Sequence, residues 1–350
     1  MLTGPYVLLT GPEKALIAFR NTSRENATVE WKTEQRGGSQ AARRQGDRYW
    51  VNLTGLTRGD LITYVVKIGG LKAGEGSFRV GPAADDKSGR FAVFGDTRTN
   101  HQVHRAVIEA LAKEKIDLFL HTGDMVERGG KPDQWVTFFQ IERPLMAKAP
   151  ILPAIGNHDI GNRGYYNSHF FLDKWAKNSS YYVTDWGNVR FISLDVTIVC
   201  VRCREYEFVV RALEEGAAYD KTMVMFLHNP PYSAGGHGSD LQLRSVLAPL
   251  AKKYGVELVV TGHDHHYERT KPIDGTTYIV SGSAGAPIRP VEPEDFTASA
   301  RTEPHYVLID ADGDKLAIRS VNLRGEVFDS TTIPPNPPGG PPPPPPGEPK

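Results

Sequence analysis

The chain has 350 residues, which is enough for two domains with a sizeable hydrophobic core. Its 41 Lys and Arg residues balance 41 Asp and Glu residues, so net charge provides no attraction to nucleic acid or to an anionic membrane. No apolar run has the length of a transmembrane helix, and the first residues lack the basic lead and apolar core of a signal peptide. We therefore expect no nucleic-acid partner and no membrane span.

Residues 1–81 are predicted to form a small all-β domain. Short apolar runs alternate with turns rich in Gly, Asn and Arg, at the spacing of a β-sandwich. The predicted strands are 15–19, 27–31, 49–53 and 61–68. Residues 53–60, which lead into the last strand, resemble the end of a fibronectin type III domain. No cluster of metal-ligating residues occurs here, so we interpret this domain as a spacer or docking module, followed by a polar linker at 82–89.

From residue 90 to residue 333, strands alternate with helices, which predicts an α/β domain. Five apolar runs each end at Asp, Asn or His. The runs are 91–94, 117–121, 151–155, 222–227 and 256–260, and segments with helical periodicity lie at 103–111, 135–139 and 241–250. Because loops converge at the carboxyl ends of strands in an open α/β sheet, we expect the polar residues after these runs to gather in one site.

The side chains after these strands are predicted to hold metal ions. They are Asp96, Asp124, Asn157, His228, His263 and His265. A mixture of oxygen ligands and imidazoles suits Zn, Fe or Mn better than Ca or Mg. One carboxylate shared by two ions would hold them about 3.5–4 Å apart, a separation that serves to activate a hydroxide and to polarise a phosphoryl oxygen. The sequence contains no P-loop and no nucleophile elbow, so the favoured nucleophile is metal-activated water.

The ligands lie in five motifs, which are GDTR at 95–98, GD at 123–124, GNHD at 156–159, HNPPY at 228–232 and GHDHHYER at 262–269. The order of these motifs resembles that of the calcineurin-like metallophosphoesterase superfamily, and within it the purple acid phosphatases that carry an N-terminal fibronectin-like domain. The resemblance implies a four-layer α/β/β/α sandwich, whose second sheet would be extended by 181–183, 189–194, 277–280 and 306–309. It also implies a dinuclear phosphoesterase that hydrolyses phosphomonoesters, with diesters as the less favoured substrate.

The resemblance also implies a role for each ligand. Asp124 would bridge the two ions, with Asp96 and His265 on the first. The second ion would be held by Asn157, His228 and His263. His158 would lie beside the phosphate and protonate or stabilise the leaving group, with Asp159 as its orienting partner.

Two positions depart from the family pattern. Arg98 stands where the superfamily often has a His, and Glu127 stands where purple acid phosphatases have a Tyr. Arg98 cannot ligate a metal, but it is predicted to pair with a substrate phosphate. Glu127 is either an oxygen ligand or a helix N-terminal carboxylate. The first metal site is therefore predicted to be weak or empty, and no purple colour is expected.

Other histidines and the cysteines have more than one interpretation. His237 lies in a glycine-rich loop and either contacts the substrate or is simply exposed. The remaining isolated histidines are predicted to be structural or at the surface, namely His104, His121 and His169. Cys200 and Cys203 form a C-x-x-C pair, for which a local disulfide or free thiols is favoured over a redox pair or half of a zinc site.

The C-terminal segment 334–350 contains six consecutive prolines, which favour polyproline II and cannot form a core. It is either a solvated spacer or a segment that docks in an aromatic groove of a neighbouring copy. The second possibility supports an alternative function, a surface or filament-forming assembly protein built on a phosphoesterase fold, with reduced or no catalysis. For the phosphoesterase we expect an extracellular, cell-surface or periplasmic location.

Overall fold

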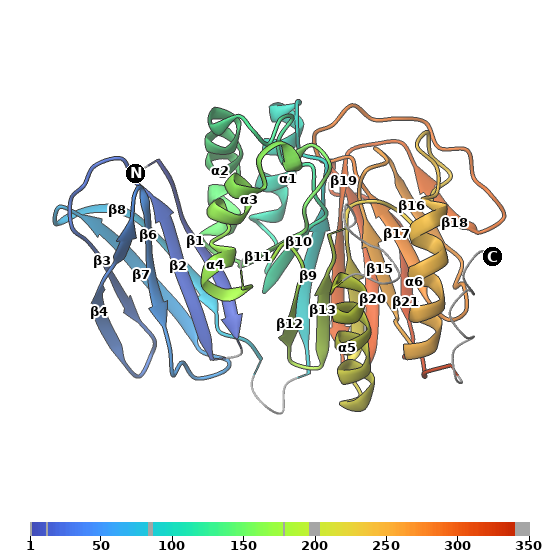
Figure 1. The fold of residues 1–350 in the computed structure, drawn as a ribbon, viewed down its shortest axis with the longest axis horizontal. Helices are drawn as coiled ribbons and strands as arrows, with labels where there is room; N and C mark the ends of the chain where they lie inside the picture. The colour runs from blue at the N-terminus through green and yellow to red at the C-terminus, as the bar shows by residue number, and fades with distance from the viewer. Residues whose placement is uncertain (1, 12, 83–86, 178, 196–203, 340–350) are drawn as a thin grey trace.

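The computed structural model describes residues 2–11, 13–82, 87–177, 179–195 and 204–339. The chain forms an all-β part at the N-terminus and a larger α/β part that contains every helix in these ranges (Figure 1). Cys200, Cys203 and the proline run after residue 340 lie outside the described residues, so the predictions made for them stay untested. None of the described helices is long and apolar enough to cross a membrane.

The N-terminal part consists of two four-stranded antiparallel sheets. One has the order β1-β2-β6-β5, formed by Thr3–Gly11, Lys14–Arg20, Arg48–Leu53 and Arg43–Gln45. The other has the order β4-β3-β7-β8, formed by Gly37–Ala41, Ala27–Lys32, Leu61–Ile68 and Leu71–Arg79. Alternate residues of β7 are buried between the sheets, as the alternating pattern predicts. β4 and β5 are exposed throughout and carry no such pattern, so the sequence did not predict them.

The first sheet of the α/β part has six strands in the order β11-β10-β9-β19-β20-β21. They are Ile151–Pro153, Leu118–His121, Gly89–Phe94, His305–Asp312, Lys315–Asn322 and Val327–Ile333. β9, β10 and β11 run parallel, which requires a crossover between each pair. The crossovers contain α1 (His101–Leu111) and α2 (Pro132–Met146). After β11 follow the short helices η1 (Asp159–Asn162), α3 (Arg163–His169) and α4 (Leu172–Trp175).

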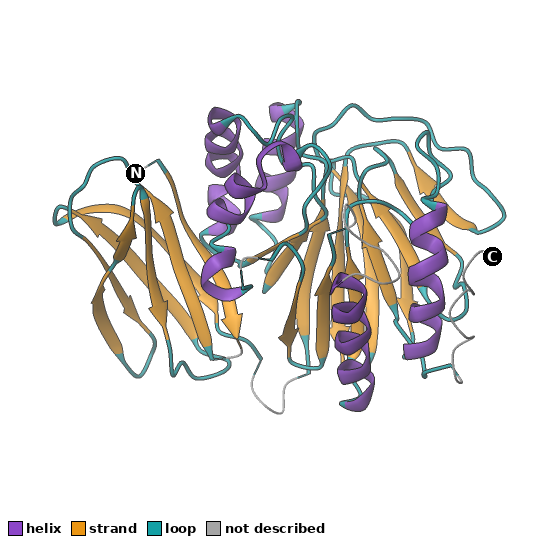
Figure 2. Cartoon of the chain, in the orientation of Figure 1, coloured by secondary structure: helices purple, strands orange, loops and turns teal. Residues whose placement is uncertain are grey.

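The second sheet has seven strands in the order β12-β13-β14-β15-β17-β16-β18. They are Tyr182–Trp186, Val189–Ser193, Thr222–Phe226, Leu258–Thr261, Thr277–Ser281, Tyr267–Thr270 and Thr297–Arg301. Two helices, α5 (Arg204–Ala218) and α6 (Leu241–Tyr254), lie against this sheet (Figure 2). Val224 and Phe226 of β14 join the core shared with the first sheet, whereas Met223 and Met225 pack under the helices. This two-residue alternation places a core on each side of the sheet, and the predicted four-layer α/β/β/α sandwich is confirmed.

One predicted strand joins a different sheet from the one expected. Residues 306–309 lie in β19, which pairs antiparallel with β9 of the first sheet, with Val307 opposite Val93. The prediction that they extend the second sheet is therefore wrong. A short run that is buried throughout fits either sheet, and its place depends on the free edge beside β9, which the sequence pattern does not encode.

The all-β part packs against the helical side of the first sheet. β1 contacts α2, and the buried hydroxyl of Tyr6 donates a hydrogen bond to the carbonyl oxygen of His169. The hydroxyl of Tyr64 donates to the carbonyl oxygen of Ala147 over 3.2 Å. At the far end of the chain, Asn336 donates its side-chain amide to the carbonyl oxygen of Val256, which holds the start of the proline-rich segment against the α/β part.

Candidate metal centre

The predicted metal ligands lie in loops that follow β9, β10, β11, β14 and β15. Three of these ligands have a left-handed backbone, with φ of +56° at Asp96, +54° at Asp124 and +70° at His263. This conformation is strained for a residue with a side chain and is common at functional sites. The two sheets thus bring polar side chains from five strand ends into one region.

Glycines next to the ligands allow these loops to approach one another closely. A Cβ atom on Gly156 would lie 2.2 Å from the backbone nitrogen of Asp124, and one on Gly262 would lie 2.3 Å from Asp96 Oδ2. Both distances are shorter than any real carbon contact, so only glycine fits. The glycines in the motifs are therefore needed because the ligand loops pack against one another.

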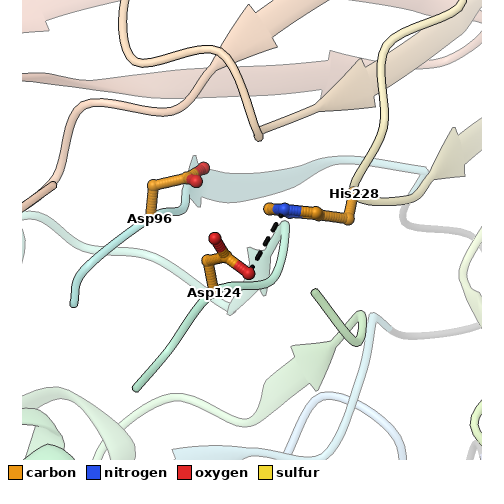
Figure 3. Close-up of side chains that lie close together, drawn as sticks. All are labelled: Asp96, Asp124 and His228. Carbon is orange, nitrogen blue, oxygen red and sulfur yellow. Dashed lines mark ion pairs between the residues drawn. The ribbon is translucent and has the colours of Figure 1, made fainter. Parts of the chain in front are cut away.

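Asp96, Asp124 and His228 form a buried cluster in which the ligand atoms all lie within 4.8 Å of one another (Figure 3). His228 Nε2 lies 3.3 Å from Asp124 Oδ1. On the other side of the ring, His228 Nδ1 lies 2.8 Å from the carbonyl oxygen of Thr122. A carbonyl only accepts, so Nδ1 carries a proton, and Nε2 faces the cluster, where it can bind a metal ion once it is deprotonated.

Asn157 and His263 complete a group of four candidate ligands around His228. Asn157 Oδ1 lies 3.0 Å from His228 Nε2 and 3.1 Å from His263 Nδ1. The two imidazole nitrogens lie 3.3 Å apart. Amide oxygen, carboxylate oxygen and deprotonated imidazole nitrogen are all metal ligands, and a metal ion bound here would replace the ring proton that His228 otherwise shares with Asp124. These residues therefore fit the second metal ion implied by the family resemblance.

The charged groups of this cluster shift one another's pKa values. Burial alone would lower the pKa of His228, but the negative charge of Asp124 and the hydrogen bond between them raise that pKa to about 9. Burial works against the charge of Asp124, yet the His228 imidazole lowers the pKa of this carboxyl below its usual range. Burial and the charge on His228 lower the pKa of His263 to about 3. The site thus favours a negative Asp124 and a concentrated positive charge next to it.

The residues predicted for the first ion have a different environment. His265 Nδ1 lies 2.8 Å from the carbonyl oxygen of Pro287, so its Nε2 lone pair faces Asp96 Oδ1 at 3.5 Å. Asp96 Oδ1 is buried and has no hydrogen-bond partner. The guanidinium of Arg98 lies on the same side, with Nε 3.1 Å from Asp124 Oδ2.

Arg98 also contacts Glu127, the second position that departs from the family pattern. Arg98 Nη1 donates to Glu127 Oε2 over 2.7 Å. Helix α2 begins at Pro132, so Glu127 lies outside the helix and does not cap its N-terminus. The structure thus places Glu127 in an ion pair with Arg98, which neither interpretation of Glu127 predicted.

His158 lies beside the cluster with a partly exposed ring. Its Nδ1 lies 2.8 Å from the carbonyl oxygen of Glu127, and its backbone N–H donates to Asp124 Oδ1 over 2.9 Å.

The predicted orienting partner of His158, Asp159, is buried and instead accepts four backbone N–H groups. They belong to Asp124, Met125, Val126 and Gly156. Burial and the charge of Asp124 raise the pKa of Asp159 to about 7. Asp159 therefore shapes the Asp124 loop, and the Glu127 carbonyl orients His158.

His237 lies at the rim of the site. Its exposed ring stacks on His263 with the ring centres 4.4 Å apart and contacts the guanidinium of Arg289. Burial and the charge of Arg289 lower the pKa of His237. Arg289 belongs to none of the sequence motifs, so the sequence did not predict it as a site residue. It lies at the site because its backbone N–H donates to the carbonyl oxygen of His265.

A cavity of about 440 Å³ opens next to His158 and Asn157, and its wall includes Glu127, Arg128 and Lys131. This volume is in the range of small-molecule sites. The histidines predicted to be structural lie away from it: His104 pairs with Glu142, and His169 contacts Arg20. His121 is buried, with its ring 3.1 Å from the Thr97 hydroxyl.

Comparison with known proteins agrees with this geometry. Residues 89–267 match the profile of the Calcineurin-like phosphoesterase family. The chain belongs to this family. Relatives of this chain include "Probable inactive purple acid phosphatase 1" of Arabidopsis thaliana, 25% identical over 49% of this chain and 35% of that protein. "Nucleotide pyrophosphatase/phosphodiesterase" of Hordeum vulgare is 26% identical over 59% of this chain and 67% of that protein.

A solved structure supports the fold over almost the whole chain. Purple acid phosphatase PPD1 from yellow lupin (Lupinus luteus) superposes with a TM-score of 0.82 at 20% identity, over 94% of this chain and 73% of that one. The likeness to purple acid phosphatases is thereby confirmed at the level of fold. The chain covers about a third of the length of the first curated relatives.

Proposed function

We propose that this phosphoesterase is a metal-dependent hydrolase of phosphomonoesters. The observation that carries the proposal is the convergence of candidate ligand atoms from Asp124, Asn157 and His228, with His228 Nε2 3.3 Å from Asp124 Oδ1 and 3.0 Å from Asn157 Oδ1. Oxygen and imidazole ligands at such separations fit a metal ion, and they lie beside a cavity that is open to a substrate. When bound there, an ion of Fe, Zn or Mn supplies a Lewis acid for the phosphoryl oxygen and lowers the pKa of water.

The surrounding side chains then have distinct tasks. His158 lines the cavity with Nδ1 held by the Glu127 carbonyl and Nε2 3.9 Å from Asp124 Oδ2, and its Nε2 can pass a proton to the leaving oxygen. Arg289 provides a permanent positive charge for the phosphate, and its contact with His237 positions both side chains at the rim. Asp159 keeps Asp124 in its left-handed conformation through the backbone of the loop.

The test is hydrolysis by the purified full chain after loading with Zn²⁺, Mn²⁺ or Fe. We expect p-nitrophenyl phosphate to be cleaved faster than bis(p-nitrophenyl) phosphate. Asp124→Ala and His263→Ala remove candidate ligands and are each expected to lower kcat/KM by at least about 100-fold. Asp312→Ala is the matched control, because this carboxylate is exposed at the end of β19. Unchanged hydrolysis in both ligand variants, or none by the loaded wild type, contradicts the proposal.

A further inference from the structure

Arg98 is the unusual element of this metal centre. It follows β9 at the place where the sequence departs from the family, and it is only 9% exposed. A guanidinium keeps its positive charge at any pH of interest and has no lone pair to give to a metal. The question is what a buried, permanent cation does among residues expected to bind another cation.

The contacts of Arg98 answer this question. The two oxygens of Asp124 contact different groups: Oδ1 lies 3.3 Å from His228 Nε2, and Oδ2 lies 3.1 Å from Arg98 Nε. A carboxylate that bridges two ions through both oxygens gives one oxygen to each. Here Oδ2, the oxygen that would then serve the first ion, already accepts a charge-assisted hydrogen bond from Arg98.

Two other groups on the first-ion side face the same guanidinium. Glu127 Oε2 lies 2.7 Å from Arg98 Nη1, and His265 Nε2 lies 3.5 Å from Arg98 Nη2. The backbone supports this placement, because the Arg98 N–H donates to the carbonyl oxygen of Asp124 over 3.3 Å. A dication among the same groups would lie close to the guanidinium in a buried setting, where like charges repel strongly.

We infer that the guanidinium of Arg98 takes the place of the first metal ion, so that this phosphoesterase holds one ion. That ion lies with Asp124, Asn157, His228 and His263. Asp96 is within reach of the same ion, because its carboxylate belongs to the 4.8 Å cluster with Asp124 and His228. Arg98 is then a positioning residue that holds Asp124 Oδ2 and Glu127, in place of the substrate-binding role predicted for it.

The test counts ions and does not depend on hydrolysis. The purified full chain is stripped with a chelator, reloaded with Mn²⁺ alone and analysed by plasma mass spectrometry. We expect about one ion per wild-type chain and about one for Arg98→Lys, which keeps the positive charge. Arg98→His, which restores the residue type common in the family, and Arg98→Ala are each expected to hold about two. Circular dichroism checks that each variant is folded.

Two ions in the wild type, or none, would overturn the inference. One ion in folded Arg98→His and Arg98→Ala would overturn it as well. Electron paramagnetic resonance of the Mn²⁺-loaded wild type gives a second answer that needs no variant: an isolated-ion spectrum supports the inference, and an exchange-coupled pair refutes it. One ion without hydrolysis would contradict the proposed function alone, whereas hydrolysis with two ions would contradict this inference alone.

Discussion

Adding a single methyl group at Gly156 provides a sharp test of the packing that shapes the metal centre. In Gly156→Ala the new Cβ would lie 2.2 Å from the backbone nitrogen of Asp124 and 2.3 Å from Asp124 Oδ1. Ordinary contact begins near 3.4 Å, so the Asp124 side chain must move by about 1 Å. The backbone cannot yield easily, because Asp159 holds the N–H groups of this loop.

The expected cost has two parts. Overpacking of this kind destabilises a folded protein by about 1–3 kcal/mol. A displacement of about 1 Å at a reacting centre lowers the rate by about 100-fold, which corresponds to about 2.7 kcal/mol in the activation barrier. We therefore expect kcat/KM for p-nitrophenyl phosphate to fall by about 100-fold, with a modest decrease in Tm and less bound metal.

Gly236→Ala is the matched control, because a Cβ atom there meets nothing within 4 Å and the backbone is not left-handed. It is expected to keep the wild-type rate, metal content and Tm. If Gly156→Ala also kept all three, the close packing between Gly156 and the Asp124 loop would not limit the geometry of the site.

Two further predictions concern stability. Asp159→Asn leaves one acceptor oxygen for four buried N–H groups, so we expect the free energy of unfolding in urea to decrease by about 2–4 kcal/mol, and a loss under 1 kcal/mol would contradict the role given to Asp159. Burial lowers the pKa of His305 to about 4. Below about pH 6.5, His305 is protonated in the unfolded chain but stays neutral in the folded chain. The free energy of unfolding should therefore fall by about 3 kcal/mol as the pH decreases from about 6.5 to about 4. His305→Gln should remove this part of the pH dependence, and an equal slope in both proteins would exclude His305 as its source.

Much of the fold was predictable because the sequence repeats one local pattern. An apolar strand followed by glycine and a polar ligand occurs at Asp96, Asp124 and Asn157, and each of these strands lies in one parallel group of the first sheet. Parallel neighbours place their carboxyl ends at the same edge, so apolar runs followed by polar residues were enough to predict that these three ligands lie close together. Strands without periodicity, such as the exposed β4 and β5, left no such signal.

The sequence by itself determined which residue types are available to the metal centre, including the two departures at Arg98 and Glu127. It did not determine where those side chains point. Only the tertiary structure turned Arg98 onto Asp124 and Glu127, gave His158 a carbonyl partner in place of Asp159, and brought Arg289 to His237. These side-chain contacts depend on the distances between loops that are far apart in the chain. The pattern of apolar and polar residues along the sequence does not contain those distances.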